Sequence, residues 1–384
     1  MKYLAILGQN PYLSLAEIAG VYPETRLALI SKEAAILDSQ NEISIDELGG
    51  IPKLGLVLED DIAVEKAKQI IADELKKLGS EQKIFFGISF YNNQSRNLYN
   101  KLGKEIKKNL ADAGYKVRWA VSRDLALSSV YIKTNKLLTR GFDFNIIFFG
   151  GKVCVAKTIA VQDFSGYEFR DMRRPARDLY AGMTPPKLAK LLINLKRGKM
   201  ENILDPFCGS GTLLSEAAVL GFKEVYGSDA SDKAVADTKE NLEWIKKNYK
   251  KIPEVEIKKC RAEDLAASWN RKFDYIATEP YLGPAVRGGL TAEKAKELQK
   301  DLNANYEKYL AGISSILNKD GYLILIVPFF ITQDKNFYLS LKLKENGFSA
   351  VPPLPKNIYS ELSIKYSRPD QKVGREIYIL KKMS

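Results

Sequence analysis

A glycine-containing turn, Asp205–Thr212, has residue types that suit a nucleotide-like ligand. It reads Asp-Pro-Phe-Cys-Gly-Ser-Gly-Thr and leads from a predicted strand into a predicted helix. Gly209 and Gly211 let the backbone approach a ligand where a Cβ atom would clash. The turn lacks both the Gly-Lys-Ser/Thr ending of a phosphate-binding loop and the third glycine of the dinucleotide fingerprint. We therefore interpret it as a cofactor loop, with a bare glycine turn as the alternative.

Acidic side chains follow four predicted strands in succession. Asp205, Asp229 and Glu279 end the first, second and fourth strands, and Asp264 comes just after the third. A single carboxylate at such a point is typically a solvated turn residue. Because α/β sheets bind ligands at the carboxyl edge of their strands, four together predict a site. Asp229 could accept hydrogen bonds from ribose hydroxyls, and Asp264 could accept one from an adenine amino group. Both NAD and S-adenosylmethionine carry these groups, so both remain candidate ligands.

Strands and helices alternate around this site, which predicts the elements that must position it. We expect strands at 202–205, 224–229, 254–260, 273–280 and 321–328, and helices at 212–220, 232–247 and 292–317. Such alternation is typical of a doubly wound parallel sheet, whose edge two late strands at 362–366 and 376–380 would close. A further helix is expected to begin at Thr184-Pro185-Pro186, with Thr184 as its N-cap.

The N-terminal part shows an α+β pattern. We expect strands at 3–7, 83–91 and 115–121, a hairpin of 144–149 and 152–161 across Gly150-Gly151, and helices at 62–78 and around Leu98, Leu102, Ile106 and Leu110. Ser14 and Glu17 have capping-box spacing, which predicts that the first helix begins at Ser14. We divide the chain into an α+β subdomain (1–60), a second domain (61–162), a polar and basic linker (163–183) and an α/β domain (184–384).

Charge is unevenly distributed along the chain. The net charge is +12, yet residues 1–89 carry 9 Lys and Arg against 14 Asp and Glu, whereas residues 90–157 carry 13 against 4. Lys101, Lys104, Lys107 and Lys108 share the polar side of one predicted helix. This pattern favours a face that binds phosphates, with a solvated surface as the alternative.

Composition excludes several classes of chemistry. The chain has no histidine, which removes a His general base and every His-containing metal site, and we expect no metal. Cys154, Cys208 and Cys260 are far apart and form no Cys-x-x-Cys pair, which indicates a reducing, cytoplasmic location without disulfides. No segment is long and apolar enough for a membrane span, and no signal peptide is evident.

Several of these segments resemble a known enzyme family. Asp205–Thr212 resembles the first motif of class I S-adenosylmethionine-dependent methyltransferases. The turn 278–283 resembles the Asp-Pro-Pro-Tyr turn of those that methylate exocyclic amino groups. Segments 170–178, 182–189 and 366–376 resemble the THUMP-domain tRNA guanosine N2-methyltransferases. The resemblance implies a Rossmann-like methyltransferase domain preceded by an α+β region with a THUMP-like RNA-binding domain.

The resemblance also implies roles for individual residues. Those implied to bind S-adenosyl-L-methionine are Thr184, Pro185, Asp205, Phe207, Gly209, Gly211, Thr212, Asp229 and Asp264. In this set, Asp205 and the two glycines would hold the methionine end, Thr184 and Pro185 would border it, and Asp229 and Asp264 would take the ribose and the adenine. Glu279 and Pro280 would accept hydrogen bonds from the target amino group, so that catalysis is mostly orientation and desolvation.

The turn departs from the family pattern at three positions. Glu279 stands where Asp is usual, Tyr281 replaces the second proline, and Leu282 takes the aromatic position. We expect Tyr281 to supply the ring that stacks on an extruded base.

The sequence as a whole predicts a methyltransferase that acts on the exocyclic amino group of a guanosine in tRNA or another structured RNA. We expect a monomer, with an accessory subunit left open. Two alternatives are a DNA amino-methyltransferase, because the turn chemistry is shared, and a non-catalytic RNA-binding protein that retains the cofactor fold. A nicotinamide-dependent oxidoreductase is the least favoured interpretation.

Overall fold

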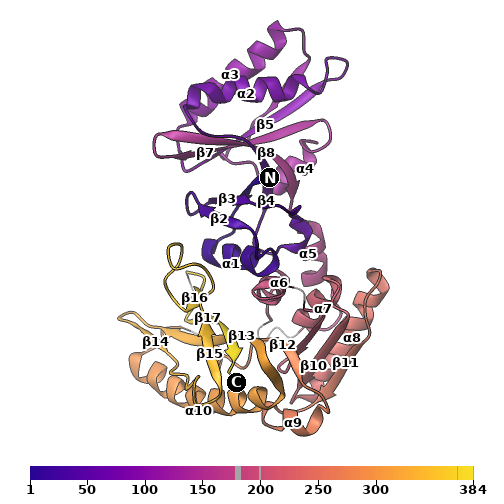
Figure 1. Ribbon diagram of the computed structural model, residues 1–384, viewed down its shortest axis with the longest axis vertical. Coiled ribbons are helices and arrows are strands. Elements are labelled where there is room, and N and C mark those ends of the chain that lie inside the picture. Colours follow the sequence, from indigo (N-terminus) through magenta and orange to yellow (C-terminus); the bar gives the residue numbers. More distant parts are fainter. Residues whose placement is uncertain (178–182, 199, 287, 370, 384) are drawn as a thin grey trace. The chain divides into compact units, whose positions relative to one another are not determined.

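The computed structural model describes residues 1–177, 183–198, 200–286, 288–369 and 371–383. Asp178, Gly182 and Asp370 of the motifs quoted above therefore lie outside the described residues. The chain forms two compact units (Figure 1): Met1–Leu15 with Glu24–Phe164, and Ala16–Pro23 with Ser165–Ser384. In the described part of the chain, no helix is long and apolar enough to cross a membrane.

One eight-stranded sheet forms the centre of the N-terminal unit (Figure 1). Its strands are β1 (Lys2–Ile6), β2 (Arg26–Leu29), β3 (Ala34–Asp38), β4 (Lys53–Ile62), β5 (Ile84–Tyr91), β6 (Val117–Ala120), β7 (Gly141–Phe149) and β8 (Lys152–Val161). Their order across the sheet is β2-β3-β1-β4-β8-β7-β5-β6. The boundary expected after residue 60 falls inside β4, which pairs with β8 and so joins the strands on either side of it into one sheet.

Two long helices cover one part of this sheet. The helices of the unit are α1 (Pro11–Val21), which continues into the second unit, α2 (Val64–Lys76), α3 (Arg96–Asp112) and α4 (Ser129–Thr134), with a short turn of 3-10 helix at Ile45–Glu47. Figure 1 shows α2 and α3 side by side. Leu102, Ile106 and Leu110 of α3 lie in the core, which confirms the predicted apolar stripe.

The predicted start of the first helix is wrong. Helix α1 begins at Pro11, and the Asn10 side chain accepts a hydrogen bond from the Leu13 backbone N–H at 3.0 Å. The Ser14 hydroxyl instead donates to the Gly50 carbonyl at 2.9 Å. Asparagine is as good an N-cap as serine, and Pro11 suits the first helical position.

The hairpin between β7 and β8 agrees with its prediction. Gly150 and Gly151 both have positive φ, 53° and 78°, as a two-residue turn matched to the strand twist requires.

The second unit is built on a nine-stranded sheet. Its strands are β9 (Asn202–Asp205), β10 (Glu224–Asp229), β11 (Val255–Lys259), β12 (Phe273–Thr278), β13 (Leu317–Ile331), β14 (Asn336–Tyr338), β15 (Phe348–Val351), β16 (Ser363–Tyr366) and β17 (Val373–Lys382). The main order is β11-β10-β9-β12-β13-β17-β15. The first five strands along this order run parallel, and β17 and β15 are antiparallel additions. The late strands close the edge as predicted, whereas β14 and β15 were not predicted.

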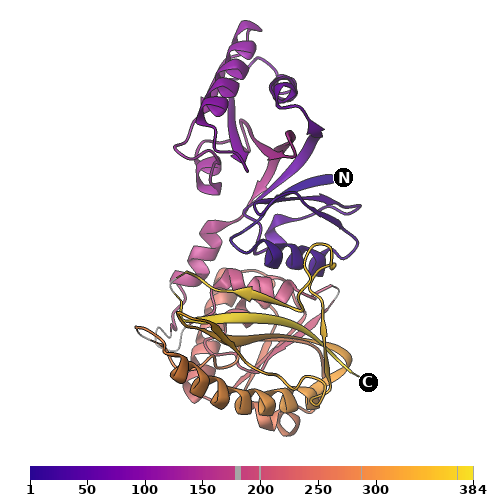
Figure 2. The same ribbon diagram turned by 90° about the vertical axis from the view of Figure 1, so that its left-hand side faces the viewer.

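Helices cover both faces of this sheet. They are α5 (Phe164–Met172), α6 (Pro186–Asn194), α7 (Thr212–Val219), α8 (Asp232–Asn248), α9 (Leu265–Ser268) and α10 (Ala292–Ile316), with a 3-10 turn at Ala262–Asp264. Successive residues of a strand point to opposite faces. Accordingly, the Tyr275 hydroxyl donates to the Ile193 carbonyl in α6 at 2.7 Å, whereas Ile276 packs in the core that α10 covers. Figure 2 shows α10, in orange, along its face of the sheet.

Candidate active site

A cavity of about 410 Å³ lies at the carboxyl edge of the parallel strands in the second unit. The predicted residues that line it are Thr184, Asp205, Phe207, Gly209, Thr212, Asp229, Glu279, Pro280 and Tyr281. Pro185, Gly211 and Asp264 do not line it. Pro185 is the N-cap of α6, and Asp264 is exposed in the turn before α9. The fold thus brings the cofactor loop and the carboxylate–proline turn to one cavity, although they lie far apart in the sequence.

Gly209 is the loop residue that leaves open space toward this cavity. Its φ is +53°, and a Cβ atom built on it would meet no described atom within 4 Å. Its N–H donates to Asp229 Oδ2 at 3.0 Å, and its carbonyl accepts from the Thr238 hydroxyl at 2.8 Å. The loop backbone is therefore held from both sides while its inner surface stays open to a ligand.

Gly211 meets a conformational and a packing requirement of the loop. Its φ is +80°, and a Cβ atom on it would lie 2.9 Å from Thr238 Cγ2 rather than in the cavity. Gly211 is the N-cap of α7, and its N–H donates to the Cys208 carbonyl at 2.7 Å. Glycine is needed here for the left-handed turn and for close packing against α8.

Asp205 is the deeply buried carboxylate of the site, with 3% of its surface exposed. Its Oδ1 accepts from the Thr278 hydroxyl at 2.6 Å and from the Phe207 N–H at 3.1 Å. Burial raises the pKa of Asp205 to about 7, because the two hydrogen bonds only partly offset the loss of water, and Asp229 and Glu279 raise it further. Asp205 can therefore change its protonation state near neutral pH.

Asp229 is oriented by backbone donors. Its Oδ1 accepts from the Ser231 N–H at 2.9 Å and its Oδ2 from the Gly209 N–H at 3.0 Å. Each carboxylate oxygen retains a further lone pair for a ligand hydroxyl.

Glu279 is fixed between two partners that come from distant parts of the chain. Arg375 Nε, on β17, donates to Glu279 Oε1 at 2.6 Å, and the Thr184 hydroxyl donates to Glu279 Oε2. Both side chains of the ion pair are largely buried, with 11% of Glu279 and 15% of Arg375 exposed. The prediction of Thr184 as a helix N-cap is wrong, because its hydroxyl serves Glu279 and Pro185 occupies the N-cap position.

Tyr281 presents an exposed ring at the same cavity. Its surface is 54% exposed, although its backbone carbonyl is held by the Tyr306 hydroxyl at 3.4 Å. Gly283, two residues later, has a φ of +99°, which allows the turn to reverse at a position where other residues would be strained. A ring that is fixed at its backbone and free on its face is suited to stacking on a planar group.

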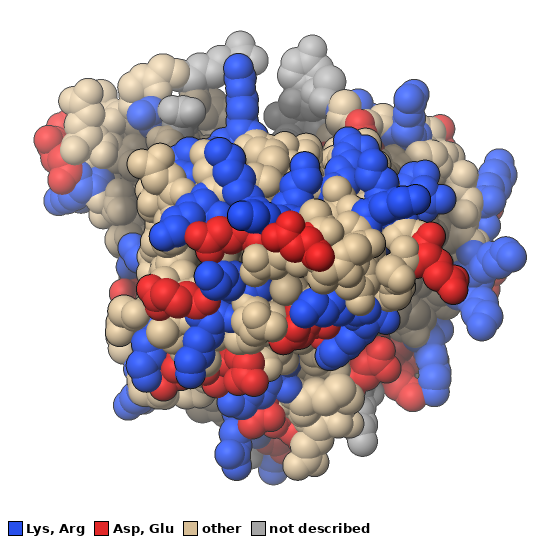
Figure 3. Space-filling model, turned by 90° about the horizontal axis from the view of Figure 1, so that it is seen from above, with Lys and Arg blue, Asp and Glu red and all other residues tan. Residues whose placement is uncertain are grey.

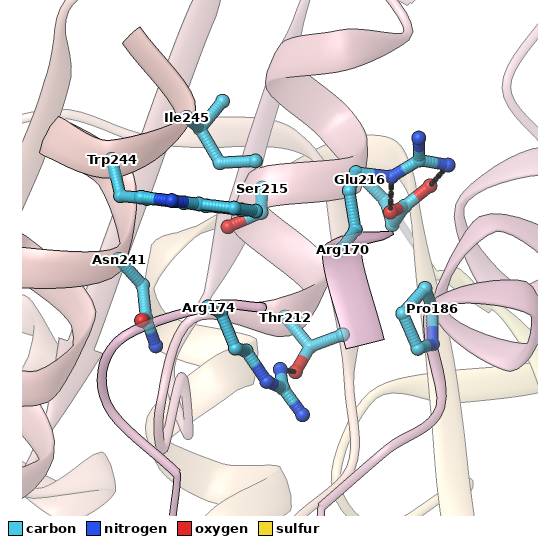
Figure 4. Close-up of a pocket in the computed structure, with 9 residues that line it drawn as sticks. All are labelled: Arg170, Arg174, Pro186, Thr212, Ser215, Glu216, Asn241, Trp244 and Ile245. Carbon is cyan, nitrogen blue, oxygen red and sulfur yellow. Dashed lines mark hydrogen bonds and ion pairs between the residues drawn. The ribbon is translucent and has the colours of Figure 1, made fainter. Parts of the chain in front are cut away.

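The segment predicted as a polar and basic linker contains helix α5, whose Arg170 is buried (Figure 4). Arg170 of α5 forms a two-pronged ion pair with Glu216 of α7, with Nη2 to Oε2 at 3.1 Å, and Arg170 Nη1 donates to the Tyr249 hydroxyl at 3.1 Å. Phe169 stacks on Trp244 of α8 at 4.8 Å between ring centroids. Composition does not reveal this helix, because a distant carboxylate can pair with a buried arginine.

Arg174 and Asn241 extend this cluster to the cofactor loop. Figure 4 shows the Arg174 guanidinium beside Thr212, whose hydroxyl accepts from Arg174 Nη1. Asn241 exchanges two hydrogen bonds of 3.0 Å with the backbone of Ala176 and donates to the Ser210 carbonyl at 2.8 Å. The segment before the methyltransferase-like region thus supports the loop from behind. Sequence reasoning missed the roles of Arg170, Arg174 and Asn241, because their partners lie far away in the sequence.

Two protein families match this chain. The family described as "Methyltransferase domain" matches residues 198–359, and the family described as "DNA methylase" matches residues 51–240. Both matches include the loop 205–212.

Curated relatives share a narrower name. A tRNA (guanine(10)-N2)-dimethyltransferase of Methanothermobacter thermautotrophicus is 28% identical over 242 residues, which are 62% of this chain and 59% of that protein. The protein of the same name from Pyrococcus abyssi is 28% identical over 56% of this chain and 58% of its own length. A probable tRNA (guanine(10)-N2)-dimethyltransferase of Methanothermococcus thermolithotrophicus is 34% identical over 36% of this chain and 77% of its own length. The chain belongs to this tRNA guanine-N2-methyltransferase family.

The family match is partial in length. The chain spans about three fifths of the first two relatives. A solved structure, TrmN from Thermus thermophilus, is similar over 100% of both chains, with a TM-score of 0.52 and 17% sequence identity. This likeness concerns the fold, and it confirms the predicted class: a Rossmann-like methyltransferase domain preceded by an α+β region with a THUMP-like domain.

Proposed function

We propose that this family member transfers a methyl group from S-adenosyl-L-methionine to the exocyclic amino group of a guanosine in tRNA. One observation carries the proposal: the Gly209 loop and the Glu279–Tyr281 turn line the same cavity. A loop that fits a cofactor and a turn that fits a base must share one enclosure for direct transfer between them. Family relatives named for the guanine N2 position support guanosine as the target.

The residues present fit the proposed cofactor. The cavity volume of about 410 Å³ lies within the range of small-molecule sites. The open face of Gly209 gives a ligand close access to the backbone, Asp229 offers acceptors to ribose hydroxyls, and Asp205 can face the amino group of the methionine end. When bound, S-adenosyl-L-methionine supplies an electrophilic methyl group. A role of Pro185, Gly211 and Asp264 in contacting it stays a prediction.

The other end of the cavity suits a flat base with an amino group. Glu279 can accept hydrogen bonds from that amino group through lone pairs that Arg375 and Thr184 leave free. The Pro280 carbonyl is a second acceptor that the resemblance implies. Tyr281 offers its exposed ring for stacking on an extruded base. These residues act by orientation and by excluding water rather than by forming a covalent bond.

The N-terminal unit supplies the proposed contact with RNA. Lys101, Lys104, Lys107 and Lys108 of α3 are exposed and form no ion pair with any residue that the structure describes. Figure 3, a view from above relative to Figure 1, shows many Lys and Arg side chains with Asp and Glu between them. Free lysines on one helix favour contact with phosphates. A cytoplasmic location and a monomeric state stay predictions.

A DNA amino-methyltransferase is the second candidate, because the "DNA methylase" family matches residues 51–240. That match ends before the turn 278–283, which is the segment proposed to contact the target base. The names of the relatives favour RNA over DNA.

Glu279→Gln tests the proposed transfer step. The substitution keeps the size of the side chain but weakens it as an acceptor, so methyl transfer to tRNA should slow by on the order of 10²-fold. Affinity for S-adenosylhomocysteine, measured by calorimetry, should stay within about twofold. Glu293→Gln, on the exposed first turn of α10, is the matched control and should leave both quantities unchanged. Near-normal transfer by Glu279→Gln would reduce Glu279 to a structural turn residue.

A further inference from the structure

We propose that Arg375 recognises the target base: its terminal amino groups donate to O6 of the guanine whose N2 amino group donates to Glu279. This inference rests on the proposed function and deepens it, because it names the groups that would distinguish guanine from other bases. The motif resemblance assigns no role to Arg375, which lies in the closing segment 366–376.

Arg375 is held so that only part of its guanidinium is engaged. Its Nε donates to Glu279 Oε1 at 2.6 Å. The described part of the chain offers no hydrogen-bond partner to its Nη1 or Nη2, although only 15% of the side chain is exposed. The residue also lines the cavity. Four N–H donors of a charged, partly desolvated group are therefore left for a ligand.

The backbone around Arg375 makes this placement rigid. Arg375 lies inside β17, where it is paired with Pro328 of β13 on one side and Tyr366 of β16 on the other. The preceding Gly374 has no side chain because the Phe329 ring occupies the space that a Cβ atom would need. A central strand positions a side chain more firmly than a loop does. The backbone of Arg375 is thus held more rigidly than the irregular turn that carries Glu279.

The pair of Glu279 and Arg375 matches the hydrogen-bonding edge of guanine. Guanine presents the N1–H and N2 amino donors beside the O6 acceptor on one edge. A carboxylate beside a guanidinium presents acceptors next to donors, which is the complementary arrangement. Adenine has no acceptor at position 6 and carries an amino group there, so it would face the guanidinium with the wrong group. Arginine is also the commonest protein partner of guanine O6 in base recognition.

A competing explanation is that Arg375 only anchors Glu279. Thr184 provides the comparison, because its hydroxyl also bonds Glu279 but at the other oxygen, Oε2. If both residues act only through Glu279, removing either one should slow methyl transfer to guanosine and to an O6-altered analogue by the same factor. If Arg375 contacts O6, only its removal should change how the enzyme responds to an altered O6.

The experiment compares guanosine with 6-thioguanosine at the methylated position of a tRNA assembled from two synthetic halves. The analogue keeps the N1–H and the amino group but replaces O6 by sulfur, a weak acceptor. Single-turnover transfer is measured for the wild type, Arg375→Gln and Thr184→Val. The wild type should methylate the analogue roughly tenfold or more slowly than guanosine, as expected for the loss of a charged hydrogen bond. In Arg375→Gln this ratio should fall to near one, whereas in Thr184→Val it should stay close to that of the wild type.

Arg375→Lys is the second variant in case Arg375→Gln fails to fold in thermal unfolding. It keeps the positive charge beside Glu279 but loses the fork of donors, so it should also lose most of the discrimination. If either folded Arg375 variant slows both substrates equally and keeps the wild-type ratio, Arg375 only positions Glu279 and this inference is wrong. If the wild type leaves guanosine unmethylated, the proposed function is wrong, and this inference, which rests on it, is wrong as well.

Discussion

Asp205 differs from the other carboxylates of the cavity because it is almost completely buried. Asp229 and Glu279 are partly exposed, whereas Asp205 lies under the cofactor loop with Thr278 and the Phe207 N–H as its donors. Burial raises the pKa of Asp205 to about 7. In the ligand-free protein it is therefore protonated below about pH 7, and it carries its negative charge only above that value.

The first prediction concerns the pH dependence of cofactor affinity. A ligand that carries a positive amino group near Asp205 binds the charged carboxylate better than the neutral acid, so affinity should rise as pH increases through 7. Between pH 6 and pH 8 the gain should be roughly tenfold, because the charged fraction rises by about that factor. Calorimetry with S-adenosylhomocysteine in the wild type and in Asp205→Asn measures it. The variant should bind with little pH dependence, and an equal slope in both proteins would show that another group titrates.

At the scale of elements, α5 supports the site from behind the loop. Its Arg170 and the following Arg174 are 8% and 5% exposed, and their partners Glu216 and Thr212 both belong to α7. Helix α7 begins directly after the glycine loop. The position of the loop therefore depends on α5, although α5 contributes no residue to the cavity itself.

The second prediction is that Arg170→Met lowers the free energy of unfolding of the second unit by about 3–5 kcal/mol, because it leaves the Glu216 charge buried without a partner. The double variant Arg170→Met/Glu216→Leu should recover most of this loss, since both charges are then removed. Chemical denaturation measures the three proteins. Lys294→Met, which breaks an exposed ion pair with Glu297, is the control and should change the value by less than about 1 kcal/mol. If Arg170→Met changes the free energy of unfolding as little as Lys294→Met does, water reaches Glu216.

The elements of the second unit show what sequence can and cannot predict. The alternation of strands and helices from Asn202 to Ile331 was predictable because each element carries its own apolar period. Helix α5 was not, because its burial depends on Glu216, which lies far away in the sequence. Strands β14 and β15 are short and gain their order from pairing with β13 and β17. Tertiary partners decide such elements, and local pattern does not contain them.

The same distinction holds for the candidate site. Asp205, Asp229 and Glu279 were predictable because strand ends converge on one edge of a parallel sheet. Arg375 was not, because it enters the cavity from an antiparallel strand near the C-terminus. The packing constraint at Gly211 was not predictable either, since the atoms that a Cβ there would meet belong to Thr238. Motif resemblance identifies the turn, and only the packing identifies what each glycine permits.

At the scale of the whole molecule, the locally basic segment 90–157 and the cavity lie in different units. Residues 90–157, with 13 Lys and Arg against 4 Asp and Glu, belong to the N-terminal unit. The cavity belongs entirely to the second unit. RNA affinity and methyl transfer should therefore be separable by mutation.

The third prediction is that replacing Lys104, Lys107 and Lys108 of α3 by glutamine weakens tRNA binding and flattens its salt dependence. These lysines would neutralise phosphates, and removing one such lysine should reduce the slope of log affinity against log salt by about 0.7–0.9. Filter-binding titrations over a series of salt concentrations measure the slope. Affinity for S-adenosylhomocysteine should stay unchanged.

A matched control removes three positive charges from the second unit instead. Lys296, Lys300 and Lys308 are exposed on α10, and the triple substitution by glutamine should leave most of the salt slope in place. Equal slopes in the two triple variants would show that α3 is a solvated face, and the search would move to other basic residues of 90–157.

Mass spectrometry of nucleosides tests the central claim most directly. Unmodified tRNA is incubated with the protein and isotopically labelled S-adenosyl-L-methionine, digested to nucleosides and compared with the same reaction of Glu279→Gln. We expect labelled N2-methylguanosine or N2,N2-dimethylguanosine from the wild type and on the order of 10²-fold less from the variant. A label on adenosine or cytidine, or no label on any nucleoside of a tRNA that the protein binds, would contradict the proposed function.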